Sequence, residues 1–340
     1  MRPARLPMLS VLTSVLVLAP VGISFAFAAS FTDVPPSDQI YSAVEYLKGR
    51  GMISGYADGT YRADNKLNRV EALAFIAGSK LLGKADLPRD SGAGFSDVSA
   101  QTWFAPYVAW AAVEARIIDD ASETQQFHPG RIVKKAEFLK MLLLAHGMDK
   151  DAYGEIRLPL APDESDVSAW HYPFCRLAIA MSVTQVGKTG YLGPERDLTR
   201  GDVALFLYRL LQYKDGERVQ ALLESVEEDA LATVRALNAK DVRTAEYASA
   251  RALLAARGAL TSMPDESLVK GALKLTEAYR ALVRGYRALT EKRYEEAIGL
   301  SKDSWFIADK ATELSPSVAS LAVSVKTNAE LLAADARAKR

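Results

Sequence analysis

The sequence has few of the residues from which catalytic and metal sites are most often built. Its 340 residues include one cysteine, Cys175, and three histidines, His128, His146 and His171. A single cysteine excludes an intramolecular disulfide framework, and the histidines lack the i, i+4 spacing of a zinc-binding helix. Cys175 stands in a mostly apolar run, which predicts a buried thiol. We find no combination of nucleophile, base and metal ligand, so the sequence predicts a protein that is not an enzyme and holds no metal or other cofactor.

A nucleotide site is also not expected. Residues 182–189 (SVTQVGKT) come one glycine short of a phosphate-binding loop. The segment follows a predicted helix rather than a strand, and Gly190, Gly193 and Pro194 prevent the phosphate-binding helix that this loop needs behind it. A loose acidic group at Asp163, Glu164 and Asp166 does not have the spacing of an EF-hand calcium loop.

Net charge and long apolar runs are scarce as well. The 42 Lys and Arg residues equal the 42 Asp and Glu residues, so no global field attracts nucleic acid or an anionic membrane. After residue 30, no segment approaches the roughly 18 apolar residues that a spanning helix requires. We therefore expect no nucleic-acid partner and no transmembrane span once the N-terminal segment is removed.

Residues 1–30 have the pattern of an export signal. Arg2 and Arg5 are followed by an apolar stretch at residues 8–23 and by the small-x-small sequence Ala26-Phe27-Ala28. This order is typical of a cleaved signal peptide, with an uncleaved anchor as the alternative. The sequence thus predicts an exported protein of the cell surface, cell wall or periplasm.

One short motif occurs three times in the first two thirds of the chain. A cation stands two residues before a carboxylate, in Leu67-Asn68-Arg69-Val70-Glu71, Val133-Lys134-Lys135-Ala136-Glu137 and Leu198-Thr199-Arg200-Gly201-Asp202. Each copy is preceded by an Asp-Val pair, at Asp33, Asp97 and Asp166, and by a short helical stretch, at residues 42–47, 106–111 and 173–178. Each is followed by a second predicted helix, at residues 72–82, 138–145 and 203–211. This repetition predicts a triplicated helix-loop-helix module.

The motif has the spacing of a helix start. Asn68 and Thr199 are good N-caps, and Glu71 and Asp202 fall at the third helical position, where a carboxylate completes a capping box. Glu137 occupies the same place in the second copy. The carboxylates are therefore expected to be primarily structural.

The cations Arg69, Lys135 and Arg200 then stand at the first helical position, beside unpaired backbone N-H groups. A cation is unfavourable there unless an anion is also present. Two explanations remain open: an anionic ligand, or an ion pair with the neighbouring acid on the surface. The threefold repetition favours the ligand.

The order of these motifs resembles the S-layer homology (SLH) domain, which usually occurs in three tandem copies. The resemblance covers residues 31–213 and is strongest in the first copy, with the loop Gly55-Tyr56-Ala57-Asp58-Gly59-Thr60-Tyr61. It implies a mainly α fold, a pseudo-threefold bundle whose inter-module grooves bind a secondary cell-wall polysaccharide, often through a pyruvate-ketal carboxylate. The implied glycan-binding residues are the three cations together with Asp33, Asp97, Asp166, Trp103 and Trp170.

The second copy departs from the family pattern. It has Lys134 at the capping position and Lys135 in place of the arginine, and Lys cannot grip a carboxylate with a planar fork. We therefore expect copies one and three to be the more competent sites. Trp103, Trp110 and Trp170 could stack on sugars, but tryptophans at helical spacing are more often part of a core.

After residue 214 the composition changes to Ala, Leu, Glu, Arg and Lys, with apolar residues at helical spacing. Five helices are expected, at residues 217–240, 242–260, 266–289, 294–314 and 318–336. The stretch Tyr294-Glu295-Glu296-Ala297-Ile298 is weakly similar to a tetratricopeptide repeat, without a second convincing copy. The region is predicted to be an antiparallel helical bundle or a short helical solenoid, with a possible protein partner.

The sequence thus divides into a signal peptide (1–30), SLH modules at 31–85, 95–148 and 163–213, and a C-terminal helical domain (215–340). The leading hypothesis is a non-catalytic envelope-anchoring protein that binds an anionic wall polysaccharide. The alternative is an exported scaffolding protein that acts through its C-terminal helices, with a purely structural SLH part.

Overall fold

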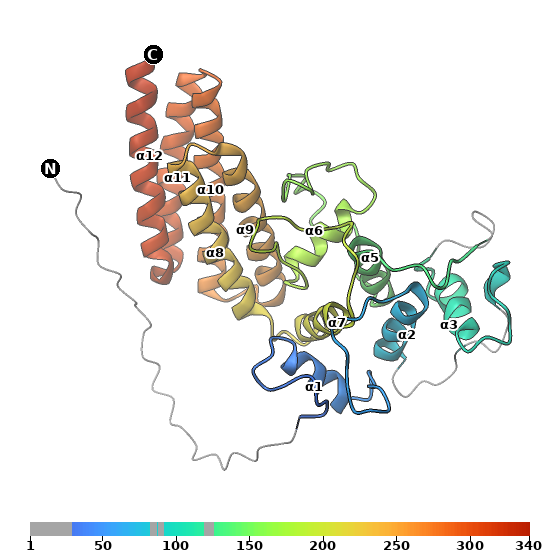
Figure 1. The fold of residues 1–340 in the computed structure, drawn as a ribbon. Helices are drawn as coiled ribbons and strands as arrows, with labels where there is room; N and C mark the ends of the chain where they lie inside the picture. The colour runs from blue at the N-terminus through green and yellow to red at the C-terminus, as the bar shows by residue number, and fades with distance from the viewer. Residues whose placement is uncertain (1–28, 82–86, 88–91, 119–125) are drawn as a thin grey trace, which may run out of the picture.

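The computed structural model describes residues 29–81, 87, 92–118 and 126–340 (Figure 1). It is mainly helical, and its described part contains isolated β-bridges but no strands. The predicted signal peptide lies almost wholly on residues 1–28, outside the described residues. Across the described residues, no helix combines the length and the apolar character that crossing a membrane demands.

The six helices expected in the first two thirds of the chain are present. The first helix of each copy is α1 (Tyr41–Gly49), α3 (Ala105–Ala109), which continues into a π-helical turn η2 (Trp110–Glu114), and α6 (Tyr172–Ala180). The second is α2 (Arg69–Lys80), α5 (Lys135–Ala145) and α7 (Arg200–Lys214). A short 3-10 turn, η1 (Gly92–Gly94), precedes the second copy. The second helices begin at the repeated cation, as the capping pattern predicted.

The three repeated motifs meet through their backbones, immediately before α2, α5 and α7. The Leu67 N-H donates to the Leu198 carbonyl at 3.0 Å, the Leu198 N-H to Val133 at 3.1 Å, and the Val133 N-H to Leu67 at 2.9 Å. These bonds form a closed cycle in which each copy donates to one neighbour and accepts from the other. All three side chains are fully buried.

One apolar core joins the three copies. It includes residues from all six helices, and Cys175 is buried in it, as predicted. Ala250 and Leu254 of the C-terminal region belong to the same core, so that region is fused to the third copy rather than tethered to it.

The C-terminal region consists of the five expected helices, whose ends agree with the prediction to within one helical turn. They are α8 (Val219–Asn238), α9 (Val242–Ser262), α10 (Ser267–Thr290), α11 (Tyr294–Leu314) and α12 (Ala319–Lys339), with a 3-10 turn η3 (Pro316–Val318) before the last. They stand side by side at one end of the molecule, and α3 lies at the other (Figure 1). Each packs on the next, while α8, α10 and α12 also contact one another.

A second copy of the turn between α10 and α11 is visible between α8 and α9. Lys240 and Lys292 both have a positive φ, of 60° and 59°. The residue after each donates its N-H back to an alanine of the preceding helix, Asp241 to Ala236 and Arg293 to Ala288, both at 2.8 Å. The two turns therefore share a backbone geometry, and the weak tetratricopeptide resemblance of residues 294–298 stays a prediction.

Candidate functional site

The carboxylates of the repeated motif are helix caps, as predicted. Asn68 with Glu71, and Thr199 with Asp202, each form a complete capping box. In the second copy Glu137 accepts the Lys134 N-H at 3.0 Å. The Lys134 ammonium cannot accept the return bond, since it has no lone pair, and it instead pairs with Asp197 of the third copy at 2.7 Å.

Among the residues that the structure describes, no ion pair joins one of these cations to the acid two residues beyond it in the same motif. That acid is held by a different arginine in copies two and three: Arg131 pairs with Glu137, and Arg196 binds both oxygens of Asp202 at 2.7 Å. The alternative of a simple surface pair within the motif is therefore wrong.

Each cation instead reaches into the neighbouring copy. Arg200 donates from Nε to the Tyr61 carbonyl at 3.0 Å and from a terminal nitrogen to the Ser54 carbonyl at 3.1 Å. Lys135 donates to the carbonyl of Leu192. Arg69 lies over the ring of Phe127, 4.8 Å from its centroid, and contacts Glu137 at 3.2 Å.

The three cations differ in how deeply they are buried. Lys135 is 2% exposed and Arg200 8% exposed, whereas the Arg69 side chain is 18% exposed. Burial is the main cause that lowers the pKa of Lys135 to about 8, with a smaller contribution from Arg196. Lys135 and Arg200 therefore join the copies from inside, and Arg69 is the cation that a ligand can reach.

The aspartates before the first helices hold the loop of their own copy. Both oxygens of Asp33 accept N-H groups, from Tyr61 and Arg62, each at 2.7 Å. Asp97 does the same with Phe127 and His128, again at 2.7 Å. These bonds contribute to lowering the pKa of Asp97, although burial acts in the opposite direction and is the largest single influence. Because both oxygens are engaged, these carboxylates shape the loop.

In the third copy this position belongs to Asp163, not to Asp166 as the Asp-Val pair predicted. Asp163 accepts the N-H groups of Leu192 and Gly193 at 2.9 and 2.7 Å. Asp166 lies three residues further on and accepts the backbone N-H and the hydroxyl of Ser168. The buried residue after Asp163 is Glu164, where copies one and two have Val34 and Val98.

A groove of about 340 Å³ opens where Arg69 meets the second and third copies. Trp170 forms part of its wall, and the lining also includes Ile117, Ile118, Glu137, Lys140 and Met141. The Lys140 ammonium lies 5.9 Å from the centroid of the Trp170 ring. The groove thus combines two cations, one carboxylate, an aromatic ring and aliphatic side chains.

The negative charge of Glu137 is already balanced by arginines within this groove. Burial would raise its pKa, but the hydrogen bonds from Arg131 and the Lys134 N-H, with the charges of Arg131 and Arg69, lower it overall. The carboxylate therefore stays ionised and holds two guanidinium groups at one wall of the groove.

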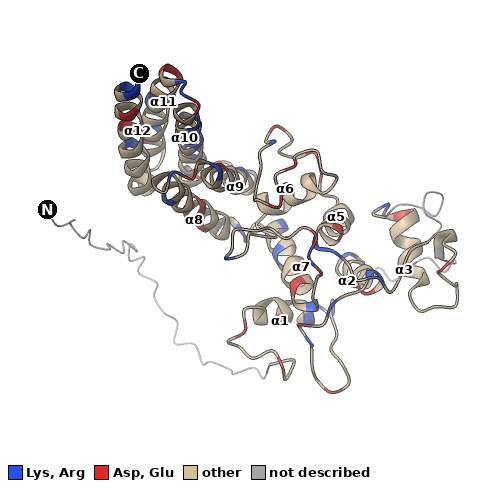
Figure 2. Ribbon diagram, turned by 45° about the horizontal axis from the view of Figure 1, so that its top comes forward, with Lys and Arg blue, Asp and Glu red and all other residues tan. Residues whose placement is uncertain are grey.

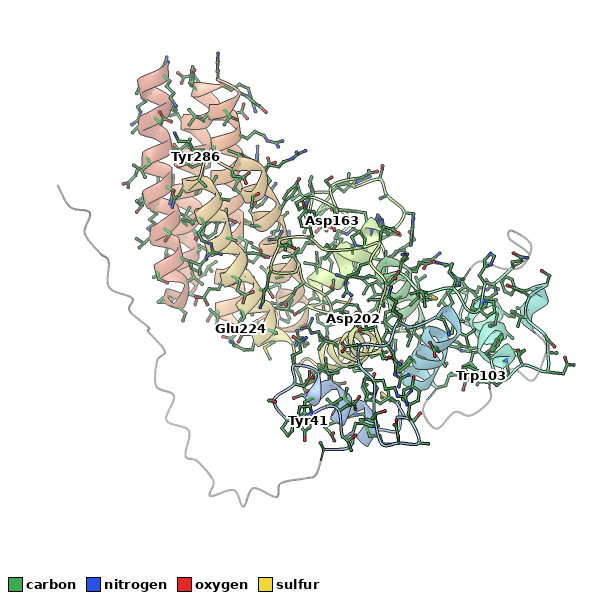
Figure 3. The ribbon with its side chains drawn as sticks, in the orientation of Figure 1. Tyr41, Trp103, Asp163, Asp202, Glu224 and Tyr286 are labelled. Carbon is green, nitrogen blue, oxygen red and sulfur yellow. The ribbon has the colours of Figure 1, made fainter. Side chains whose placement is uncertain are left out.

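The tryptophans differ in burial. Trp110 is 4% exposed and belongs to the core, as predicted for tryptophans at helical spacing. Trp170 and Trp103 are 54% and 63% exposed, so the core prediction is wrong for these two. Trp170 lines the groove, but Trp103 stacks edge-on with Phe104 and Tyr107 near α3, at the far end of the repeated part (Figure 3).

Two lining groups were missed from the sequence. Lys140 lies one turn after Glu137 on α5, so the helical spacing alone places both side chains on one face. Ile117 and Ile118 follow the π-helical turn, and no sequence pattern pointed to them.

Residues 30–73 match the family model of the S-layer homology domain. The chain is similar to the S-layer protein EA1 of Bacillus anthracis, with 27% identity over 197 residues, which is 58% of this chain and 22% of that protein. It is also 26% identical over 213 residues, 62% of this chain and 18% of the relative, to the middle cell wall protein of Brevibacillus brevis. The chain thus spans about a fifth of the length of these curated relatives.

Proposed function

We propose that residues 31–213 form three SLH modules around a pseudo-threefold axis and anchor this exported protein to an anionic cell-wall polysaccharide. Several observations support the arrangement. The hydrogen bonds of Leu67, Val133 and Leu198 run in a cycle, and equivalent cations reach from each copy into the next. The similarity to S-layer proteins extends over about 200 residues, which is longer than one copy.

The observation that carries the proposal is the groove in which Arg69, Lys140 and Trp170 converge. A guanidinium supplies charge-assisted hydrogen bonds to a carboxylate, and an exposed indole ring stacks on the apolar face of a sugar. A carboxylate-bearing sugar, such as a pyruvylated terminal residue, combines both features in one ligand.

The three cations then have different roles. Arg69 contacts the glycan, whereas Lys135 and Arg200 fix neighbouring modules against each other. Asp33, Asp97 and Asp163 position the loops, because each uses both carboxylate oxygens on backbone N-H groups. Asp166 and Trp103, although implied by the family resemblance, lie outside the groove that we propose.

Sedimentation with purified cell-wall sacculi tests this function. The double variant Arg69→Ala/Trp170→Ala should lose wall binding by roughly 10- to 100-fold, the equivalent of one charge-assisted hydrogen bond with a stacking contact. A matched double variant, Arg157→Ala/Tyr191→Ala, removes an exposed arginine just before the third copy and an exposed tyrosine within it, neither of which lines the groove. The control should bind like wild type.

Sacculi stripped of their secondary polysaccharide, and sacculi with the polysaccharide but without pyruvyl groups, complete the experiment. Loss of binding to the first and weaker binding to the second would support a carboxylate-bearing glycan. Equal binding by wild type and by Arg69→Ala/Trp170→Ala would show that the groove is not the site.

The scaffolding alternative is favoured by a separate feature of the C-terminal helices. A cluster of arginines lines a groove there, and Arg69 is not part of that groove.

A further inference from the structure

A second polar groove, here called the arginine groove, lies where the C-terminal helices meet the segment just before the third copy. It has a volume of about 290 Å³. Its wall is formed by Arg280, Arg284 and Arg287 of α10 and by Arg293 just before α11, with Leu158, Pro159, Glu246 and Glu296 at its edges. The positions of Lys and Arg along α10 are marked in Figure 2.

The arginine groove has more cations than carboxylates to neutralise them. Arg287 pairs with Glu246, and Arg293 pairs with both Glu291 and Glu296, which leaves three carboxylates for four arginines. Arg280 donates to a neutral group, the hydroxyl of Ser249, at 3.0 Å. Within the described part of the chain, neither Arg280 nor Arg284 has a carboxylate within ion-pair distance.

The arginines of this groove also repel one another. Burial lowers the pKa of Arg280, and the charges of Arg284 and Arg287 lower it further, although Glu246 acts in the opposite direction. An arginine remains protonated under these conditions, so the shift marks mainly the cost of burying a charged guanidinium, to which the repulsion from Arg284 and Arg287 adds. An anion bound between Arg280 and Arg284 would relieve it.

Arg280 and Arg284 are shared with an adjoining groove of about 450 Å³ between α9, α10 and α11. Its lining is mostly apolar, with Leu253, Ala281, Leu300, Phe306 and Ile307, and it also contains Glu277 and Asp303. Phe306 is 67% exposed. A continuous surface therefore runs from four arginines to an aliphatic and aromatic pocket.

We propose that this surface binds an extended acidic segment of a protein partner, with its carboxylates at Arg280 and Arg284 and a following apolar side chain beside Phe306. A polysaccharide could satisfy the arginines, but it has no side chain that would fill an aliphatic pocket lined by Leu253 and Ile307. A peptide provides carboxylates and an apolar side chain within a few residues. The inference does not depend on wall binding, since it uses none of the residues around Arg69.

Fluorescence anisotropy with a defined probe tests the proposal on the whole protein. The probe is a fluorescein-labelled peptide of four glutamates, one glycine, one leucine and one phenylalanine. We expect saturable binding that weakens as salt rises, because the contacts of the glutamates are partly solvent-exposed. A peptide with glutamines for the glutamates, and one with glycines for the two apolar residues, should each bind at least about tenfold more weakly.

Variants test whether the peptide probe binds at the arginine groove. Arg280→Ala/Arg284→Ala should weaken probe binding at least about tenfold, and Arg284→Ala alone, at an exposed position that cannot disturb the core, should weaken it in the same direction. The matched control Arg50→Ala/Arg235→Ala removes two exposed arginines, one just after α1 and one on α8, and should leave binding within about twofold of wild type.

Three results would overturn the proposal. One is no saturable binding of the probe by wild type, and another is an equal loss in the control variant. The third is inorganic polyphosphate displacing the probe while the glycine-substituted peptide binds as well as the original. In that case the surface recognises charge alone, and a protein segment is not its ligand.

Discussion

Arg200 and Tyr61 hold each other by two hydrogen bonds in opposite directions. The Arg200 guanidinium donates to the Tyr61 carbonyl at 3.0 Å, and the Tyr61 hydroxyl donates to the Arg200 carbonyl at 2.9 Å. The two residues are 139 positions apart in the chain. They therefore connect the third copy to the first and close the cycle of repeated motifs.

Arg200→Ala should destabilise the protein without acting on the ligand directly. It leaves the carbonyl groups of Tyr61 and Ser54 without their donor in a buried site, at a cost of about 2 to 4 kcal/mol. Arg200→Lys should recover part of this loss. Urea unfolding checks the prediction, with Arg157→Ala as an exposed control. A change below about 0.5 kcal/mol would contradict the structural role.

The sequence was sufficient to locate the helices of the repeated part, because caps and apolar spacing are local signals. It placed Arg69, Lys135 and Arg200 at the first helical position, and the structure confirms this. It could not show which copy each cation reaches. That depends on how the three copies are arranged around one another, and equivalent positions in an alignment carry no information about it.

The third copy shows a second limit of the sequence. Asp166-Val167 has the expected motif, yet Asp163 makes the contacts, because the loop contains one extra residue before Trp170 and places Glu164 where the other copies have valine.

In the C-terminal region the repeated turn was detectable in principle, since Ala236-Leu237 and Ala245 repeat as Ala288-Leu289 and Ala297. The different residues at Asp241 and Arg293 concealed it.

Replacing each of the two aspartates of the third copy by alanine tests whether Asp163, and not Asp166, holds the loop. Asp163→Ala removes both acceptors for the N-H groups of Leu192 and Gly193, so it should cost about 2 to 3 kcal/mol of unfolding free energy. Asp166→Ala should cost less, about 0.5 to 1 kcal/mol, since its partners are exposed. Urea denaturation of both variants decides the order. A larger effect at Asp166 would restore the original alignment.

Glu164 should make stability depend on pH. Burial raises its pKa to about 7 from 4.5, and Asp163 and Asp166 act in the same direction, while the nearby Cys175 thiol and the charge of Lys135 act against it. His171 faces the same carboxylate at 3.6 Å and has a pKa lowered mainly by burial. Because the folded state holds the Glu164 proton more tightly, this group stabilises the fold below pH 4.5, and the contribution is lost as pH rises to 7.

Glu164→Gln removes this dependence. The variant should gain stability relative to wild type between pH 4.5 and pH 8, by on the order of 2 to 4 kcal/mol. Urea unfolding at both pH values measures the gain, and Glu155→Gln, which also removes a carboxylate but at an exposed position, is the control. A difference between Glu164→Gln and wild type that is the same at both pH values would refute the assignment.

Two helical glycines should respond in opposite ways to the same substitution. A Cβ built on Gly258 of α9 would lie 1.6 Å from the Ala180 carbonyl oxygen at the end of α6, so Gly258→Ala must push the two helices apart. We expect a loss of about 1 to 3 kcal/mol. Gly299 of α11 is exposed with nothing within 4 Å of a Cβ, so Gly299→Ala should stabilise by up to about 1 kcal/mol. Thermal denaturation of both variants gives the comparison. If Gly258→Ala were as stable as Gly299→Ala, α9 would not be docked on the third copy as described.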